Sequence, residues 1–287
     1  MHQRLEKASP SRIDLGQTIN SGQVFLWQRF ANTWYGVNGG DILAIDEDKP
    51  EQIRTFSGSG YDLFRNGDNF DRIRKEISKD KTVRDAVHRF PGLRLVRQDP
   101  FQCYISFIVS ANSNIQNIRL TLQRISKKFG KKASFEKKEF YLFPEPKKLA
   151  LASNSELLSC GLGYRAKFVK SASLAVKENR IDLEELKKAN YDSAKSALLQ
   201  IDGIGNKVAD CILLFSLEKL EAFPLDRWIL RNLRQYYGQK FLFEGKTLTD
   251  KKYQQLHYNL VNYFGRYAGY CQQYLFKLIR ESSNKKW

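Results

Sequence analysis

The sequence has few of the residues that bind metals or perform histidine chemistry. Its 287 residues include four cysteines and three histidines, with no CxxC pair and no cluster of the two types. Structural zinc and iron–sulfur sites need clustered ligands, so we expect no metal site and no iron–sulfur cofactor. The scattered histidines likewise give no sign of a histidine-based catalytic group. The residues concerned are Cys103, Cys160, Cys211, Cys271, His2, His88 and His257.

The chain also lacks a long apolar run and an excess of acidic residues. No segment approaches the roughly 18 consecutive apolar residues that a membrane span needs, so we expect no membrane partner. Lysine and arginine number 48 against 31 aspartates and glutamates, which gives a formal net charge of +17. Such a charge favours DNA or RNA as the partner. We therefore expect an intracellular protein, in the cytoplasm or nucleoid of a prokaryote or the nucleus of a eukaryote.

Two patterns of side chains divide the chain. Residues 11–65 contain short aromatic or β-branched runs separated by Asn, Gly and Asp, which is typical of antiparallel strands. Helical periodicity begins after about residue 70. We predict an α+β fold, with an N-terminal β-rich domain over residues 1–90 and an all-α region over residues 91–287. The lysine-rich residues 125–140 favour a helix end followed by a solvated loop, with DNA contact as the alternative.

The stretch 192–226 has a pattern suited to holding DNA. An apolar helical run ends at Ile201, a tight turn contains Gly203 and Gly205, and a second helical run follows. Two glycines permit positive φ and leave no Cβ in the way of a ligand. The unpaired N–H groups and positive dipole end of the second helix suit a phosphate. The turn therefore predicts a contact with the DNA backbone, with an ordinary αα-hairpin as the alternative.

Lys207 and Asp226 are the candidate catalytic residues. Lys207 lies on the first turn of the second helix, where the dipole disfavours the ammonium form and favours a nucleophilic amine for Schiff-base chemistry. Asp226 follows Pro224 and precedes another helical run, so it can cap that helix. The same carboxylate could stabilise positive charge on a reacting sugar. The plain alternatives are a surface lysine that contacts phosphate and a helix cap.

Together these features resemble the helix-hairpin-helix DNA glycosylases, with Lys207 in the position of the lysine of bifunctional members. A second motif, Ser-Gly-Gln-Val-Phe-Leu-Trp at residues 21–27, is similar to a signature of the 8-oxoguanine DNA glycosylases. In that family the glycine carbonyl accepts a hydrogen bond from the N7–H that oxidised guanine has and guanine lacks. The resemblance implies that Gly22 recognises the lesion; a glycine in a strand bend is the alternative.

Two more motifs resemble segments of this family that contact the duplex. Residues 93–118 are similar to the segment that opens the helical body, and Asn112 would enter the space left by the flipped base. Residues 161–167 are similar to a segment beside the base opposite the lesion, where Tyr164 would wedge and Arg165 would hydrogen-bond. Without the resemblance, Asn112 would be expected to cap or end a helix.

The resemblance also implies a pocket for the flipped base. Cys211 lies one helical turn beyond Lys207 and would contact one face of the base. In the C-terminal helix Gln272 would hydrogen-bond its Watson–Crick edge, and Phe276, four residues on, would stack on it. The alternatives are a small core cysteine and an amphipathic helix with a partly buried glutamine.

The hairpin departs slightly from the family pattern, with Asp202 where proline is common and no glycine before Pro224, and Asn117 and Trp228 are larger departures. Asn117 stands where well-known members have an arginine that reaches the orphaned cytosine, which predicts a weaker preference for cytosine opposite the lesion. Trp228 stands where relatives have a histidine near the phosphate of the lesion. Tryptophan cannot make that charge-assisted contact, so the role of Trp228 is left open.

The resemblance implies a monomeric, bifunctional DNA glycosylase/AP lyase whose chemistry requires no metal and no organic cofactor. Such an enzyme excises 8-oxoguanine from duplex DNA through a lysine Schiff base and cleaves the strand by β-elimination in base excision repair. Its helical body has two subdomains. The alternatives are a glycosylase of this fold for another base, against which Gly22, Gln272 and Phe276 argue, and a non-catalytic DNA-binding module, which would have no use for Lys207 with Asp226.

Overall fold

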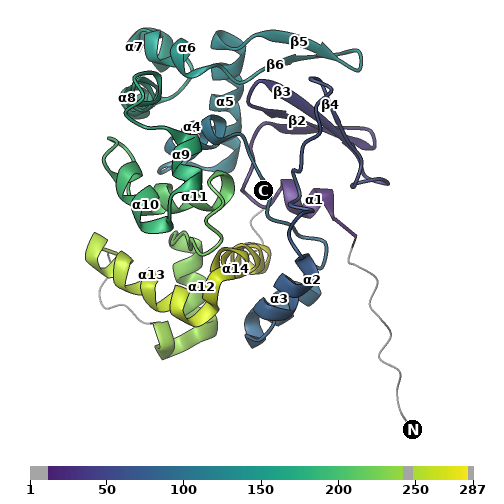
Figure 1. The fold of residues 1–287 in the computed structure, drawn as a ribbon, viewed down its shortest axis with the longest axis vertical. Helices are drawn as coiled ribbons and strands as arrows, with labels where there is room; N and C mark the ends of the chain where they lie inside the picture. The colour runs from purple at the N-terminus through teal and green to yellow at the C-terminus, as the bar shows by residue number, and fades with distance from the viewer. Residues whose placement is uncertain (1–11, 242–247, 284–287) are drawn as a thin grey trace.

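The fold combines an antiparallel sheet with a helical body beside it (Figure 1). The computed structural model describes residues 12–241 and 248–283; the start of the predicted N-terminal domain, including His2, lies outside them. A short helix, α1 (Leu15–Ile19), precedes the sheet. The strands follow one another in the order β1 (Trp27–Phe30), β2 (Thr33–Asn38), β3 (Asp41–Asp46) and β4 (Ile53–Thr55).

The two central strands of the sheet, β2 and β3, are buried on both faces, and the alternation of their side chains explains why. Tyr35 pairs with Ala44 and Val37 with Ile42, and these side chains join the core shared with the helical body. Side chains on the other face, including Trp27 and Trp34, join a second apolar cluster. Successive strand residues point to opposite faces, so one apolar sequence serves two cores.

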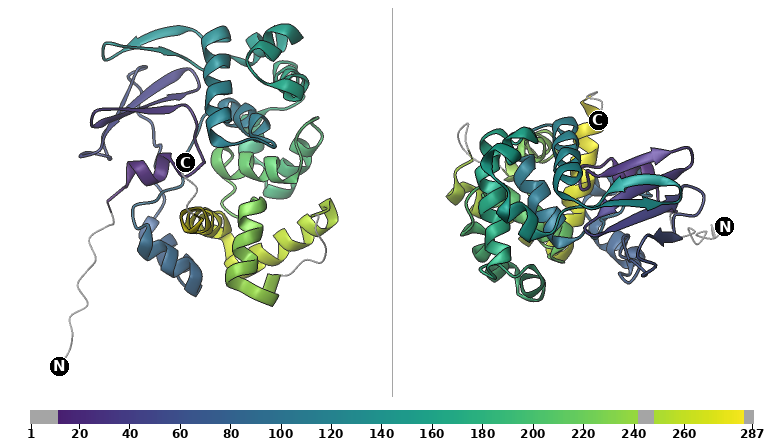
Figure 2. Two further views of the ribbon diagram at one scale, coloured as in Figure 1. Left: turned by 180° about the vertical axis from the view of Figure 1, so that it is seen from behind. Right: turned by 90° about the horizontal axis from the view of Figure 1, so that it is seen from above.

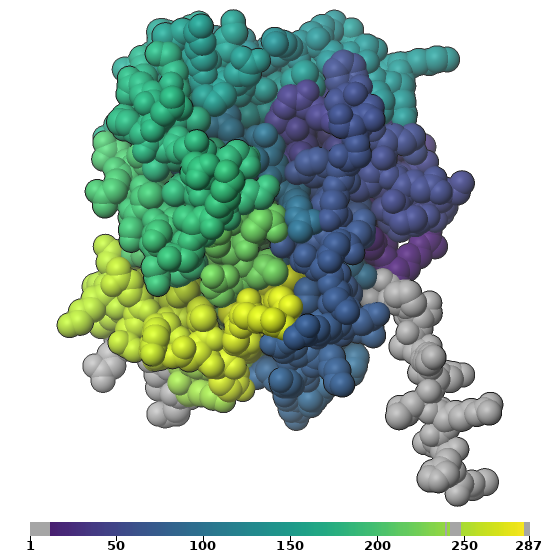
Figure 3. Space-filling view, in the orientation of Figure 1, coloured from purple at the N-terminus to yellow at the C-terminus, as the bar shows by residue number. Residues whose placement is uncertain are grey.

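The helical body forms two groups of helices (Figures 1 and 2). Within the upper group of Figure 1, α4 packs on α5, α8 and α11; within the lower group, α14 packs on α2, α3, α12 and α13. Figure 3 shows the yellow C-terminal helices against the blue segment around residues 70–90. The predicted α+β fold with two helical subdomains is confirmed. The helices are α2 (Phe70–Ile77), α3 (Lys81–Arg89), α4 (Pro100–Ser110), α5 (Ile115–Phe129), α6 (Pro146–Leu151), α7 (Asn154–Ser159), α8 (Ala166–Lys177), α9 (Leu183–Lys188), α10 (Tyr191–Leu199), α11 (Asn206–Ser216), α12 (Arg227–Tyr237), α13 (Asp250–Phe264) and α14 (Ala268–Ser282), with 3-10 turns η1 (Gly163–Arg165), η2 (Gly238–Phe241) and η3 (Gly265–Tyr267).

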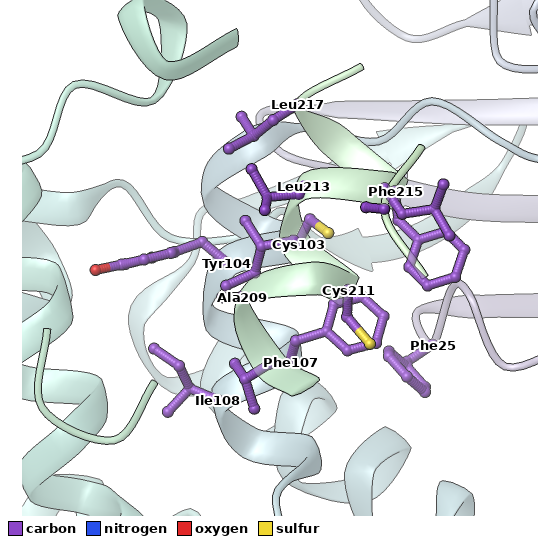
Figure 4. Packing of buried hydrophobic residues seen from close by; sticks show 14 of the residues in the cluster. Phe25, Cys103, Tyr104, Phe107, Ile108, Ala209, Cys211, Leu213, Phe215 and Leu217 are labelled. Atoms are coloured by element: carbon purple, nitrogen blue, oxygen red, sulfur yellow. The ribbon is translucent and has the colours of Figure 1, made fainter. Parts of the chain in front are cut away.

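The helices α4 and α11 form the centre of the upper group. Asp99 caps α4 by accepting a hydrogen bond from the Gln102 amide at 2.7 Å, and Pro100 occupies the first turn, where a missing N–H costs nothing. Phe107 of α4 stacks on Phe215 of α11 with ring centroids 5.4 Å apart (Figure 4). This packing fixes the helix that carries the candidate nucleophile.

The lysine-rich residues 125–140 differ from the prediction. The helix end is present, but the expected loop is wrong, since β5 (Lys132–Phe135) and β6 (Lys138–Tyr141) pair as a hairpin. Its two turn residues, Glu136 and Lys137, have φ of 48° and 61°. Tight hairpins require this left-handed conformation, which Asn and Gly adopt most readily. Because neither turn residue is asparagine or glycine, the sequence did not predict this hairpin.

Candidate active site

A cavity of about 1080 Å³ lies where the N-terminal region meets the helices α5, α11, α12 and α14. Its wall joins residues that are far apart in the chain. Of the candidate site residues, the cavity is lined by Gly22, Asn112, Arg165, Lys207, Asp226 and Phe276. The remaining candidates, which lie behind the wall or outside it, are Cys211, Tyr164, Gln272, Gly203 and Gly205.

Lys207 reaches the cavity from the first turn of α11. Its ammonium nitrogen lies 5.3 Å from the centre of the Phe107 ring. The residue before the helix, Gly205, gives no side-chain cap, so no side chain of the turn competes for the first N–H groups of α11. This leaves those N–H groups suited to an anion.

The two glycines of the turn differ in conformation. Gly203 has φ of +88°, and a Cβ there would lie 2.4 Å from the Phe168 ring, so this position requires glycine. Gly205 has φ of −92° and ψ of 176°, which is extended. The predicted positive φ is therefore wrong for Gly205. The space expected beside it is present, because no heavy atom lies within 4 Å of a Cβ built there.

Asp226 both caps α12 and faces Lys207. Its Oδ1 accepts hydrogen bonds from the Trp228 and Ile229 amides, each at 2.9 Å, which confirms the predicted cap. Both bonds use Oδ1, so capping is compatible with a role for Oδ2 in the cavity. Burial raises the pKa of Asp226, while the charge of Lys207 and the two amide hydrogen bonds oppose that rise.

Gly22 and Phe276 line the same cavity as Lys207, and Cys211 interacts with Lys207 from within α11. Gly22 lies in the turn after α1 with φ of +84°, and a Cβ there would approach Cε1 of Phe276 to 3.4 Å. Cys211 lies one turn along α11 from Lys207 and is buried. Burial raises the pKa of the Cys211 thiol to about 11, and the charge of Lys207 opposes this effect.

Gln272 lies behind the cavity wall, against the segment that carries Asp226. Its Nε2 donates to the Pro224 carbonyl at 3.2 Å. Its Oε1 is buried and has no hydrogen-bond partner within the described residues. An unpaired buried acceptor costs about 1–3 kcal/mol, so this oxygen is suited to a donor that arrives with a ligand.

Asn112, Tyr164 and Arg165 form one exposed edge of the cavity. Asn112 adopts φ of 49°, a left-handed conformation that asparagine tolerates better than most residues. Arg165 donates from Nε to the Ala111 carbonyl at 2.7 Å and from a terminal nitrogen to the Asn112 carbonyl at 3.0 Å. Its guanidinium also lies 4.6 Å from the Tyr164 ring centre. The three predicted duplex-contacting side chains are therefore adjacent.

Arg280 is a cavity residue that the sequence analysis did not identify. It lies over the Trp228 ring at 4.7 Å, and both residues line the cavity. Burial lowers the pKa of Arg280, and the charge of Asp226 opposes this. The spacing of the sequence could have identified Arg280, because Gln272, Phe276 and Arg280 follow one another at four-residue intervals and so share one helix face.

Two protein-family models match successive parts of the sequence. One, described as 8-oxoguanine DNA glycosylase, N-terminal domain, matches residues 7–104. The other, described as HhH-GPD superfamily base excision DNA repair protein, matches residues 105–256. The chain belongs to the HhH-GPD superfamily of base excision DNA repair proteins. The resemblance to 8-oxoguanine DNA glycosylases within this superfamily is confirmed, whereas the predicted domain boundary at residue 90 stays a prediction.

The chain is similar to proteins named as N-glycosylase/DNA lyases and to solved structures of 8-oxoguanine glycosylases. The "Probable N-glycosylase/DNA lyase" of Methanothermobacter thermautotrophicus is 32% identical over 228 residues, which cover 71% of this chain and 69% of the relative. The "N-glycosylase/DNA lyase OGG1" of Arabidopsis thaliana is 28% identical over 291 residues, covering 94% and 78%. The Clostridium acetobutylicum 8-oxoguanine glycosylase/lyase, solved with dsDNA containing cytosine opposite 8-oxoG, matches with a TM-score of 0.83 and 30% identity, covering 94% and 93%.

Proposed function

We propose that this protein is a bifunctional DNA glycosylase/AP lyase that excises 8-oxoguanine from duplex DNA in base excision repair. The observation that carries the proposal is the convergence of Lys207 and Asp226 on one cavity, with Gly22 and Phe276 in the same wall. A module that only held the DNA backbone would need the α11 N-terminus but not this pair. The family and the names of the relatives support the reaction and the lesion.

In this proposal the duplex binds along the edge formed by Asn112, Tyr164 and Arg165. Asn112 fills the space of the extruded nucleotide, while Tyr164 and Arg165 contact the opposite base. A backbone phosphate binds at the N–H groups of the turn that contains Gly203 and Gly205. The formal charge of +17 favours this association and makes it sensitive to salt.

The flipped base enters between Cys211 and Phe276. The Gly22 carbonyl accepts a hydrogen bond from the N7–H of 8-oxoguanine, which guanine lacks, so guanine would leave this acceptor without its donor. The buried Oε1 of Gln272 accepts from the Watson–Crick edge of the base. Together these contacts favour 8-oxoguanine over the other bases that enzymes of this fold remove.

The first chemical step replaces the base with Lys207. Lys207 first gives its ammonium proton to water. The neutral amine then forms a bond to C1′ as the bond from C1′ to N9 breaks, and the electron pair of that bond leaves with the base. Asp226 stabilises the positive charge that develops on the sugar. The base takes up a proton and departs, the attached amine loses one, and opening of the sugar ring gives the Schiff base.

The second step cleaves the strand. A base removes a proton from C2′, the electron pair of that C–H bond turns the C2′–C3′ single bond into a double bond, and the 3′ phosphate leaves with the electrons of the C3′–O3′ bond. Water then hydrolyses the Schiff base and restores Lys207. Every electron pair comes from the DNA, the lysine or water, so the proposed chemistry calls for no redox partner.

Borohydride trapping tests this proposal. Wild type, Lys207→Gln and the exposed control Lys251→Gln are incubated with an 8-oxoguanine·C duplex and sodium borohydride, which reduces the Schiff base to a stable amine. We expect a covalent protein–DNA band for wild type and Lys251→Gln and none for Lys207→Gln. Another outcome is that wild type binds the duplex without giving a trapped band. Release of the base in that case would mean a monofunctional glycosylase, and the absence of both trapping and base release would mean a DNA-binding module.

The partner and the compartment follow from the proposed substrate. Duplex DNA containing 8-oxoguanine is the partner, and an enzyme that acts on it works inside the cell. The finer assignment, to the cytoplasm or nucleoid of a prokaryote or to a eukaryotic nucleus, stays a prediction, as does the monomeric state. Among the described residues, no helix combines the length and apolar character needed to cross a membrane.

A further inference from the structure

A buried polar cluster is centred on Asp210 of α11, the helix that carries Lys207. Asp210 lies three positions after Lys207, and its side chain is fully buried. It accepts hydrogen bonds from the Tyr253 hydroxyl at 2.6 Å and the Tyr191 hydroxyl at 2.7 Å, and it pairs with the Lys195 ammonium at 3.0 Å. One carboxylate therefore ties α11 to both α10 and α13.

The cluster also includes His257, whose Nε2 lies 3.8 Å from the Asp210 carboxylate. Tyr253 and His257 hold the backbone that leads to Asp226. The Leu225 amide donates to the Tyr253 hydroxyl at 3.0 Å. The Phe223 amide donates to Nε2 of His257 at 3.2 Å. The segment 217–226 between α11 and α12 contains no helix or strand, so its backbone groups need partners outside regular secondary structure. Side chains of α13 supply two of them.

We propose that Asp210, Tyr253 and His257 are positioning residues that fix Asp226 relative to Lys207. The connection is short at both ends, because Asp210 shares a helix with Lys207 and Leu225 is the neighbour of Asp226. It runs from α11 through the Asp210 carboxylate and the Tyr253 hydroxyl to the Leu225 amide. This inference rests on the proposed function, since it concerns the distance between the two groups assigned to the reaction.

The protonation of the cluster suits this arrangement. Burial and the neighbouring Asp210 raise the pKa of Tyr253, so its hydroxyl keeps the proton that it donates to Asp210 while accepting from Leu225. Burial lowers the pKa of His257 to about 4, so the ring is neutral at neutral pH and Nε2 can accept from the Phe223 amide. Nε2 also lies 3.0 Å from the Tyr191 hydroxyl. The charged and titratable groups around His257 are Asp210, Lys195, Tyr191, Asp192 and Tyr253.

A role in positioning also explains why the cluster is polar. A buried ion pair such as Lys195 with Asp210 is often no more stabilising than apolar residues of the same volume, because both charges lose their water. Hydrogen bonds instead specify one geometry. Reactions that depend on aligned groups lose about a hundredfold in rate when a group moves by about 1 Å, so a fixed Asp226 is worth that cost.

The first test compares two tyrosines. Tyr253→Phe removes the hydroxyl between Asp210 and Leu225, and the control Tyr274→Phe removes a comparable buried hydrogen bond, from the Tyr274 hydroxyl to the Leu93 carbonyl at 3.1 Å. We expect single-turnover base excision by Tyr253→Phe to fall by at least about tenfold. Affinity for a duplex with an uncleavable abasic analogue should stay within about twofold of wild type, and Tyr274→Phe should keep its rate.

The second test uses the acceptor on His257. Gln can present an acceptor to the Phe223 amide and Leu cannot, so His257→Gln should excise faster than His257→Leu by about fivefold or more. This pair keeps the inference testable if Tyr253→Phe does not fold. Equal rates for the two His257 variants would overturn it, as would a Tyr253→Phe enzyme that is less stable but excises at the wild-type rate. Absence of excision by wild type would instead refute the proposed function.

Discussion

Acidification should destabilise the folded protein through His257. Its pKa is about 4 in the folded protein against 6.5 for the free side chain. Because one pKa unit corresponds to about 1.36 kcal/mol, protonating His257 costs the native state about 3 kcal/mol more than it costs the unfolded chain. The contribution is fully present above pH 6.5, where both states are neutral. It is lost as the pH falls from 6.5 towards 4, where only the unfolded state binds the proton.

The assay is urea unfolding of wild type and His257→Gln at a series of pH values from 7 to 4.5. Carboxylates also titrate in this range, but they do so in both proteins, so the difference between the two isolates His257. Over this interval wild type should lose about 2 kcal/mol relative to the variant. A difference that stays constant with pH would refute the reasoning, because it would mean that His257 is equally easy to protonate in both states.

Three further predictions concern other parts of the molecule. Gly22→Ala places a Cβ at φ of +84° beside Phe276, so urea unfolding should show a loss of about 1–2 kcal/mol and competition binding a weaker preference for 8-oxoguanine over guanine. The Glu218 carboxylate lies 2.5 Å from the buried Arg65. Glu218→Gln should lower the free energy of unfolding at pH 7 by about 1–2 kcal/mol, because Arg65 loses one charged partner but keeps Asp68 at 2.7 Å; an unchanged urea midpoint would contradict this. Asn117→Arg should sharpen the preference for cytosine opposite the lesion, whereas wild-type rates that differ by more than about a hundredfold between cytosine and the other bases would contradict the reading of Asn117.

Local signals predicted the parts of the fold that depend on neighbouring residues. The short aromatic and β-branched runs of residues 11–65 form the predicted antiparallel sheet, and Asp226 caps α12 as its place after Pro224 indicates. The turn with Gly203 follows from the same kind of signal, since its φ of +88° suits glycine alone. These features need only contacts within a few positions of the chain.

Tertiary contacts decided the features that the sequence analysis did not predict. The β5–β6 hairpin lacks turn glycines, and Glu136 of its turn instead accepts a hydrogen bond from the Tyr35 hydroxyl at 2.6 Å and pairs with Arg54 at 2.7 Å, both in the N-terminal sheet. Gln272 has the expected helix face but contacts Pro224. The Asp210 cluster joins three helices, so the spacing of residues within any one helix could not predict it.

The burial of the four cysteines should protect the protein from inactivation under oxidative stress. All four are free thiols in the interior, and burial raises the pKa of each, including Cys211 at the base pocket. Peroxides attack the thiolate rather than the thiol, and solvent access limits the reaction further. These thiols stay protonated and shielded from solvent, so the oxidants that convert guanine to 8-oxoguanine should react with them slowly. The protein should therefore keep its activity while the lesion it repairs accumulates.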